Sequence, residues 1–120
     1  MSSQELARTE RVVRAILENH YDKANNHYSS DLFMNGDVSL SRLDIKSYDE
    51  IVDIFLYELD KPNRVVVGTG EISVGDLQDI GLAHTEKPTK ITVLPKPTKL
   101  NTAHAEMPQK VSKGLSRKII

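Results

Sequence analysis

The stretch from Asn101 to Lys118 packs many polar functional groups into few residues. If residues 102 to 107 are extended, His104 and Glu106 lie on one face of the strand, because side chains alternate along it. A carboxylate beside an imidazole orients the ring and favours the charged form that arises when the neutral ring, as a general base, takes up a proton. His104 and Glu106 are therefore the candidate catalytic residues.

Basic residues directly after this pair supply candidate anion-binding groups. Lys110, Lys113 and Arg117 lie in a segment that we expect to be helical, and the N-terminal amides of a helix favour anions. Arg42, from an earlier segment, would join them if the fold brought it to the candidate catalytic pair. Together these groups could hold a phosphate beside a proton-transfer group.

Each of these residues also has a purely structural interpretation. A His-x-Glu sequence is common by chance, and His104 would then be satisfied by a neighbouring backbone group. Arg42 would pair with Asp37 or Asp44, and a basic last helical turn would simply complement the helix dipole. The sequence leaves both interpretations open.

Other kinds of site are not expected. His20 and His27 are separated by a predicted helix end, so they do not have the spacing of zinc ligands. The sequence GTGEISVG, residues 68–75, lacks the Lys-Ser/Thr ending of a phosphate-binding loop. Ser39 and Ser41 lie outside any nucleophile-elbow motif. We therefore expect no metal and no cofactor.

Composition indicates one domain, residues 1–120, without disulfides. A chain of 120 residues is a usual single-domain length, and the absence of cysteine excludes disulfides and thiolate metal sites. This favours a cytoplasmic protein. The first residues lack the apolar segment of a signal peptide, and the longest apolar run, residues 51–59, is interrupted by Asp53 and Glu58. No membrane association is expected.

The charge is unevenly distributed along the chain. Residues 1–86 contain eight Lys/Arg and sixteen Asp/Glu, a net charge of −8, whereas residues 87–120 contain eight and one, a net charge of +7. The two halves could neutralise each other across the fold. Alternatively, residues 87–120 form a basic surface for an anion such as a nucleic acid.

Hydrophobic periodicity and capping signals predict seven elements. Apolar spacing predicts an amphipathic helix over residues 4–21, with Arg14 pointing away from its apolar face. Ser47 and Glu50 form a capping box before a second helix that ends near residue 59. The other expected elements are a strand at 37–43, a buried central strand at 64–72, a helix at 73–81 from Ser73 to Gly81, a strand at 90–94, and a final helix from Pro108. The predicted fold class is α+β or α/β, with about three strands covered by helices and the strand direction left open.

Three segments carry a resemblance to a known family. Residues 37–43 (DVSLSRL), 71–82 (EISVGDLQDIGL) and 101–119 (NTAHAEMPQKVSKGLSRKI) are similar to a family of small bacterial proteins with an Asn-Pro-Ala-His-Ala-Glu-like stretch. The chain departs from this pattern at Thr102, where the family has proline. The family has no established activity, so the resemblance implies only a bacterial or phage accessory protein.

Three functional hypotheses follow. The first is an accessory or regulatory binding protein, for example in a defence or toxin–antitoxin operon, with a protein partner or a second copy as its ligand. The second is a metal-independent enzyme acting on RNA or another phosphate substrate through His104 and Glu106. The third is nucleic-acid binding through residues 87–120. Because no complete catalytic set is visible, we favour the first.

Overall fold

A five-stranded antiparallel sheet forms the centre of the molecule. The computed structural model describes residues 5–22, 27–28, 31–34, 36–60, 62, 65–85 and 88–119. Within these residues the strand order is β5-β1-β4-β7-β6, and β2 and β3 form a separate ribbon. The strands are β1 (Arg11–Leu17), β2 (Tyr21–Asp22), β3 (His27–Tyr28), β4 (Val38–Arg42), β5 (Val66–Ser73), β6 (Leu94–Pro95) and β7 (His104–Met107).

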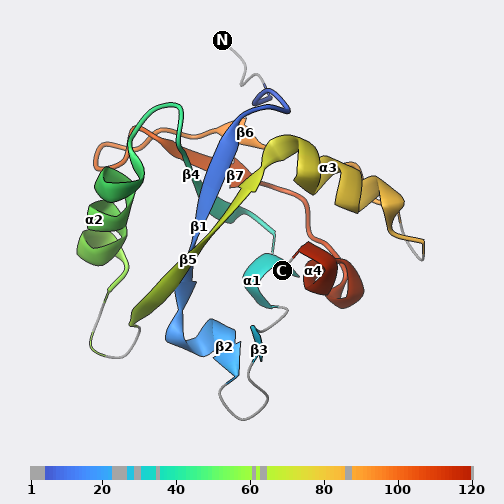
Figure 1. The fold of residues 1–120 in the computed structure, drawn as a ribbon, viewed down its shortest axis with the longest axis horizontal. Helices are drawn as coiled ribbons and strands as arrows, with labels where there is room; N and C mark the ends of the chain where they lie inside the picture. Colours follow the sequence, from blue (N-terminus) through green and yellow to red (C-terminus); the bar gives the residue numbers. More distant parts are fainter. Residues whose placement is uncertain are drawn as a thin grey trace.

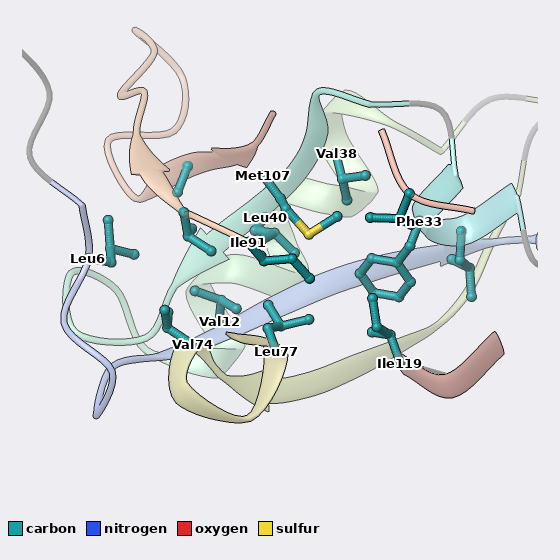
Figure 2. Close-up of a cluster of buried hydrophobic side chains, with 14 of the residues drawn as sticks. Leu6, Val12, Phe33, Val38, Leu40, Val74, Leu77, Ile91, Met107 and Ile119 are labelled. Carbon is teal, nitrogen blue, oxygen red and sulfur yellow. The ribbon is translucent and has the colours of Figure 1, made fainter. Parts of the chain in front are cut away.

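Helices cover both faces of this sheet (Figure 1). They are the 3-10 helix η1 (Glu18–His20), α1 (Asp31–Met34), α2 (Tyr48–Glu58), α3 (Val74–Ala83) and α4 (Lys113–Ile119). Helix α2 packs alone on one face, where Ile51 and Phe55 contact Val13 and Ala15. The other face carries α1, α3 and α4 over the main hydrophobic cluster, part of which is shown in Figure 2.

The predicted number of strands was wrong, although the α+β class is consistent with the structure. Five strands, not about three, form the main sheet of the described residues, and all four pairings are antiparallel. The strand expected at residues 90–94 is reduced to β6, Leu94–Pro95. Strands of two or four residues, such as β6 and β7, are too short to give a clear alternating pattern.

The first predicted helix, residues 4–21, is also wrong, because its apolar centre forms β1. Val12 and Ile16 are buried in the cluster on one face of the sheet, and Val13 and Ala15 in the cluster on the other. A strand that is buried on both faces has no polar alternation, so its apolar pairs imitate the spacing of a helix. The β-branched residues of RVVRAIL suit the strand that forms.

Strand β5 exists as predicted, but it lies at an edge of the sheet and not in its centre. It pairs with β1 from Ser73, opposite Arg11, to Val66, opposite Leu17. Gly70 is exposed, and a Cβ there would touch only Ile16, at 4.0 Å. A Cβ at Gly68 would have nothing within 4 Å. The glycines therefore mark an open edge strand.

The two helices with capping signals at Ser47 and Ser73 are confirmed, whereas a third capping box, expected from Ser2 and Glu5, belonged to the wrongly predicted first helix. The Ser47 hydroxyl accepts a hydrogen bond from Glu50 N (3.3 Å), and Glu50 Oε1 accepts one from Ser47 N (3.1 Å). Ser73 caps α3 in the same way, accepting from Asp76 N at 3.1 Å. Gly81 does not end α3, which continues to Ala83. The last helix begins at Lys113, later than Pro108, and Ser112 Oγ accepts from Leu115 N at 3.1 Å.

Candidate functional site

His104 and Glu106 lie on the same face of β7, as the expected extended conformation requires. Both are half-buried, and they alternate with Ala105 and Met107, which are fully buried. In the adjacent strand β4, Ser41 lies opposite His104 and Ser39 opposite Glu106. The shared face is the one on which α2 packs, because Ala105 and Met107 belong to the cluster on the other face.

The orientation of the His104 ring is set by the backbone. Nδ1 donates a hydrogen bond to the carbonyl oxygen of Lys96 at 2.8 Å, since a carbonyl can only accept. In the neutral ring Nε2 is therefore the free acceptor. No hydrogen bond joins His104 to Glu106 in the described part of the chain, so Glu106 does not orient the imidazole.

A pocket of about 160 Å³ lies beside His104, between β4, β7, the second half of α2, the segment before β7, and β1, from which Arg14 and Ala15 line it. Glu58 and Thr98 add polar groups to its wall. Within it, Asn101 Nδ2 donates to the buried Ser41 hydroxyl at 3.0 Å, and Asn101 Oδ1 accepts from Ala103 N at 3.0 Å. Ser41 and Asn101 thus have structural hydrogen bonds within this pocket.

Arg42 lies on the opposite face of β4 and does not meet the candidate pair. Its guanidinium binds the Glu10 carboxylate through Nε (2.5 Å) and Nη2 (3.0 Å), and the Glu10 side chain is only 5% exposed. This hydrogen bonding raises the pKa of Arg42 above its ordinary value, against the effect of burial. Neither Asp37 nor Asp44 forms this ion pair. An anion would have to displace Glu10 to reach the guanidinium.

The other predicted anion-binding residues do not gather at His104 either. Lys110 is exposed in the segment between β7 and α4. Lys113 and Arg117 lie in α4, but their side chains fall outside the described part of the structure. Helix α4 packs on the face of the sheet opposite His104, with Leu115 in the main cluster.

Arg14 is a candidate binding residue that the sequence analysis missed. It projects from β1, and Nε and Nη2 both donate to Leu32 O (3.3 and 3.1 Å), while Nη1 donates to Ser39 O (3.3 Å). The β1–β4 ladder stops after Val13 and Ser41, so the guanidinium supplies Ser39 O with a donor where the strands separate. Burial lowers the pKa of Arg14. The only signal in the sequence was an arginine inside an apolar run, RVVRAIL.

The outer edge of β5 is unpaired in the described part of the sheet. In the described part of the chain β5 pairs only with β1, over all eight of its residues except the bulge. The other edge strand, β6, has two residues, one of them Pro95, which lacks an N–H. Within β5, Val67 is 51% exposed.

Two further features, a membrane-spanning helix and a metal-binding cluster, are absent from the described residues. No helix there is long and apolar enough to span a bilayer. No group of three or more His, Asp or Glu side chains there is arranged to hold a metal ion.

Comparison with protein families, curated proteins and solved structures finds no match to this chain.

Proposed function

We propose that this chain is an accessory binding protein that recognises an extended, basic and apolar segment of a partner protein, which adds as a strand to the outer edge of β5. The observation that carries the proposal is the contrast between the two edges of the sheet. Proteins normally shorten, charge or cover their edge strands to avoid pairing. Strand β6 follows this rule, whereas β5 is eight residues long and contains no proline.

The backbone of β5 offers alternate residues to a partner. Val74 N donates to Glu10 O at 2.9 Å, so even-numbered residues of β5 face β1 where the ladder is regular. By this alternation, the N–H and C=O groups of Thr69 and Glu71 face outward. An added strand would form hydrogen bonds with these groups, as in known cases of β-strand addition.

The surroundings of β5 indicate the chemistry of the partner. Tyr48–Glu58 contains four acidic and no basic residues, and Tyr48 of this helix hydrogen-bonds Thr69 of β5 at 2.7 Å. Val65 and Val67 are exposed apolar side chains beside the same edge. A segment that alternates basic and apolar residues would complement both properties.

A second copy of the chain is a poorer occupant than a different protein. Antiparallel pairing of two β5 edges about a two-fold axis would place both α2 helices on the same face of one continuous sheet. The acidic helices would then lie near each other, and like charges brought together across an interface are unfavourable. The same acidic character favours a basic partner.

An enzymatic function has less support from the geometry. His104 has a defined tautomer and a small pocket, but Arg42 is bound by Glu10 and α4 lies on the other face of the sheet. Arg14 lines the same pocket as His104, but its guanidinium binds the carbonyl oxygens of Leu32 and Ser39, and none of the predicted anion-binding residues lines this pocket.

A proline substitution tests strand addition. Thr69→Pro removes an outward N–H without removing a hydrogen bond to β1, whereas Thr69→Val removes only the hydroxyl. The probe is an acetylated peptide that alternates lysine and valine, with binding followed by backbone amide chemical shifts. We expect wild type and Thr69→Val to bind it, and Thr69→Pro to bind at least about tenfold more weakly, a difference of about 1.4 kcal/mol.

Three results would contradict the proposal. These are absence of binding by the folded wild type, equal binding by the folded Thr69→Pro variant, and equal binding of a peptide that alternates glutamate and valine. Sedimentation equilibrium serves as a control: a dimer that Thr69→Pro dissociates would assign the edge to a second copy and not to a partner.

A further inference from the structure

A second pocket, of about 230 Å³, lies on the face of the sheet opposite His104, between the β1–β5 pair and helices α1 and α4. We call it the Arg14 pocket. Figure 2 shows two of its residues, Phe33 and Ile119, side by side at one end of the main hydrophobic cluster. Its walls are mostly apolar, and among the described residues Arg14 is the only basic side chain lining it. The apolar residues of the wall are Ile16, Leu32, Phe33, Ile72 and Ile119.

Arg14 differs from the other arginines whose side chains are described. Arg8, Arg11 and Arg42 each form an ion pair with an acid, with Asp79, Glu71 and Glu10 respectively. Arg14 instead donates only to the two carbonyl oxygens of Leu32 and Ser39.

Among the described residues, the Arg14 guanidinium therefore has unused donors and no acidic partner. A guanidinium has five N–H donors, and the three hydrogen bonds of Arg14 leave two of them for a ligand. Burial lowers the pKa of Arg14, and no acidic side chain among the described residues pairs with it to offset the loss of solvation. An anionic ligand would supply the missing counter-charge.

We propose that the Arg14 pocket binds a small carboxylic acid with an aromatic ring or a short branched chain, whose carboxylate pairs with Arg14. Two oxygens of a carboxylate match the spacing of guanidinium N–H groups. A single arginine in an apolar wall suits a monoanion better than a phosphate dianion, because each further buried charge needs its own partner. A cavity of about 150 Å³ in another protein holds benzene, so the Arg14 pocket has room for a benzoate-sized acid.

Glu71 does not act against this assignment, although it also lines the Arg14 pocket. Its carboxylate is paired with Arg11. Side chains alternate along β5, so Glu71 projects to the face opposite Gly70 and Ile72. The negative charge of Glu71 is thus both neutralised and directed away from Arg14.

Gly70 provides a way to fill the Arg14 pocket without touching Arg14. A Cβ at Gly70 would meet only Ile16 Cδ1, at 4.0 Å, so the side chain of Gly70→Val starts into the pocket without a clash at Cβ. Gly68→Val is the matched control: it lies on the same face of the same strand, nothing lies within 4 Å of its Cβ, and it does not line the pocket. Both substitutions suit a strand.

The experiment measures the binding of benzoate, phenylacetate and 4-methylpentanoate by chemical shifts, with the corresponding neutral amides as controls. We expect at least one acid to bind about tenfold or more tightly than its amide to wild type and to Gly68→Val. Gly70→Val should lose this binding. Arg14→Gln, which keeps a donor for the carbonyls but removes the charge, should bind acid and amide alike.

Three outcomes would overturn the proposal: no acid binds to the wild type, acid and amide bind equally to it, or Gly70→Val binds the acid as well as Gly68→Val does. If Arg14→Gln fails to fold, the comparison of the two glycine variants still decides. The inference does not depend on strand addition at β5, since the Lys–Val peptide is not used.

Discussion

Arg42 and Arg14 both project from strands, and the partners of their guanidinium groups decide what each residue can do. Arg42 pairs with the carboxylate of Glu10, which lies 32 residues earlier in the chain. Arg42 therefore joins the segment before β1 to β4. Arg14 also joins two segments, α1 and β4, but through carbonyl oxygens, so its charge stays available.

The first prediction concerns this ion pair. Arg42→Met should destabilise the fold by about 3 kcal/mol, because it leaves the buried Glu10 carboxylate, 5% exposed, without its partner. Chemical denaturation would measure the change. The double variant Glu10→Met with Arg42→Met should lose much less stability. If the single and double variants were equally unstable, the ion pair would not be the cause.

At the residue scale, the sequence predicted how residues close together in the chain are arranged. It missed contacts between residues that lie far apart in the chain. The shared face of His104 and Glu106 follows from strand alternation alone, and the structure shows it. The partner of Arg42 could not be predicted, because Glu10 meets it only through the pairing of β1 with β4. Arg14 was placed on the outside of a helix, because its neighbours were expected to be helical.

At the scale of the elements, capping signals predicted α2 and α3, since each cap is a contact within a few residues. Strand β1 was missed because it is buried on both faces and so lacks polar alternation. This burial results from α2 packing on one face of the sheet and α3 on the other, which the sequence does not reveal. Strand β5 was taken for a central strand because β-branched residues indicate a strand but not its position in a sheet.

A second prediction belongs to the contact between α3 and the segment that follows it. At Gly81 a Cβ would lie 2.5 Å from Thr89 O and 2.9 Å from Ile91 Cδ1, so Gly81→Ala should destabilise the fold by about 1–3 kcal/mol. Gly68→Ala, at a position with open space, should be neutral or slightly stabilising. Thermal unfolding of the two variants would test this. A stable Gly81→Ala would show that α3 does not approach this segment so closely.

At the scale of the whole molecule, no ion pair among the described residues joins the acidic first part of the sequence to its basic last part. The ion pairs among the described residues all join residues before position 87. The four acidic side chains of α2 form no ion pair with another described residue, as the proposed basic partner requires. Nucleic-acid binding by residues 87–120 stays a prediction, and steep weakening with added salt would be its signature.

The most direct test of strand addition is amide hydrogen exchange along β5, with and without the lysine–valine peptide. In the free protein, the amides of Thr69 and Glu71 should exchange fast, whereas that of Gly70, which faces β1, should exchange slowly. With peptide, Thr69 and Glu71 should become protected while Gly70 changes little. Unchanged exchange at Thr69 and Glu71 in the presence of bound peptide would contradict strand addition at β5.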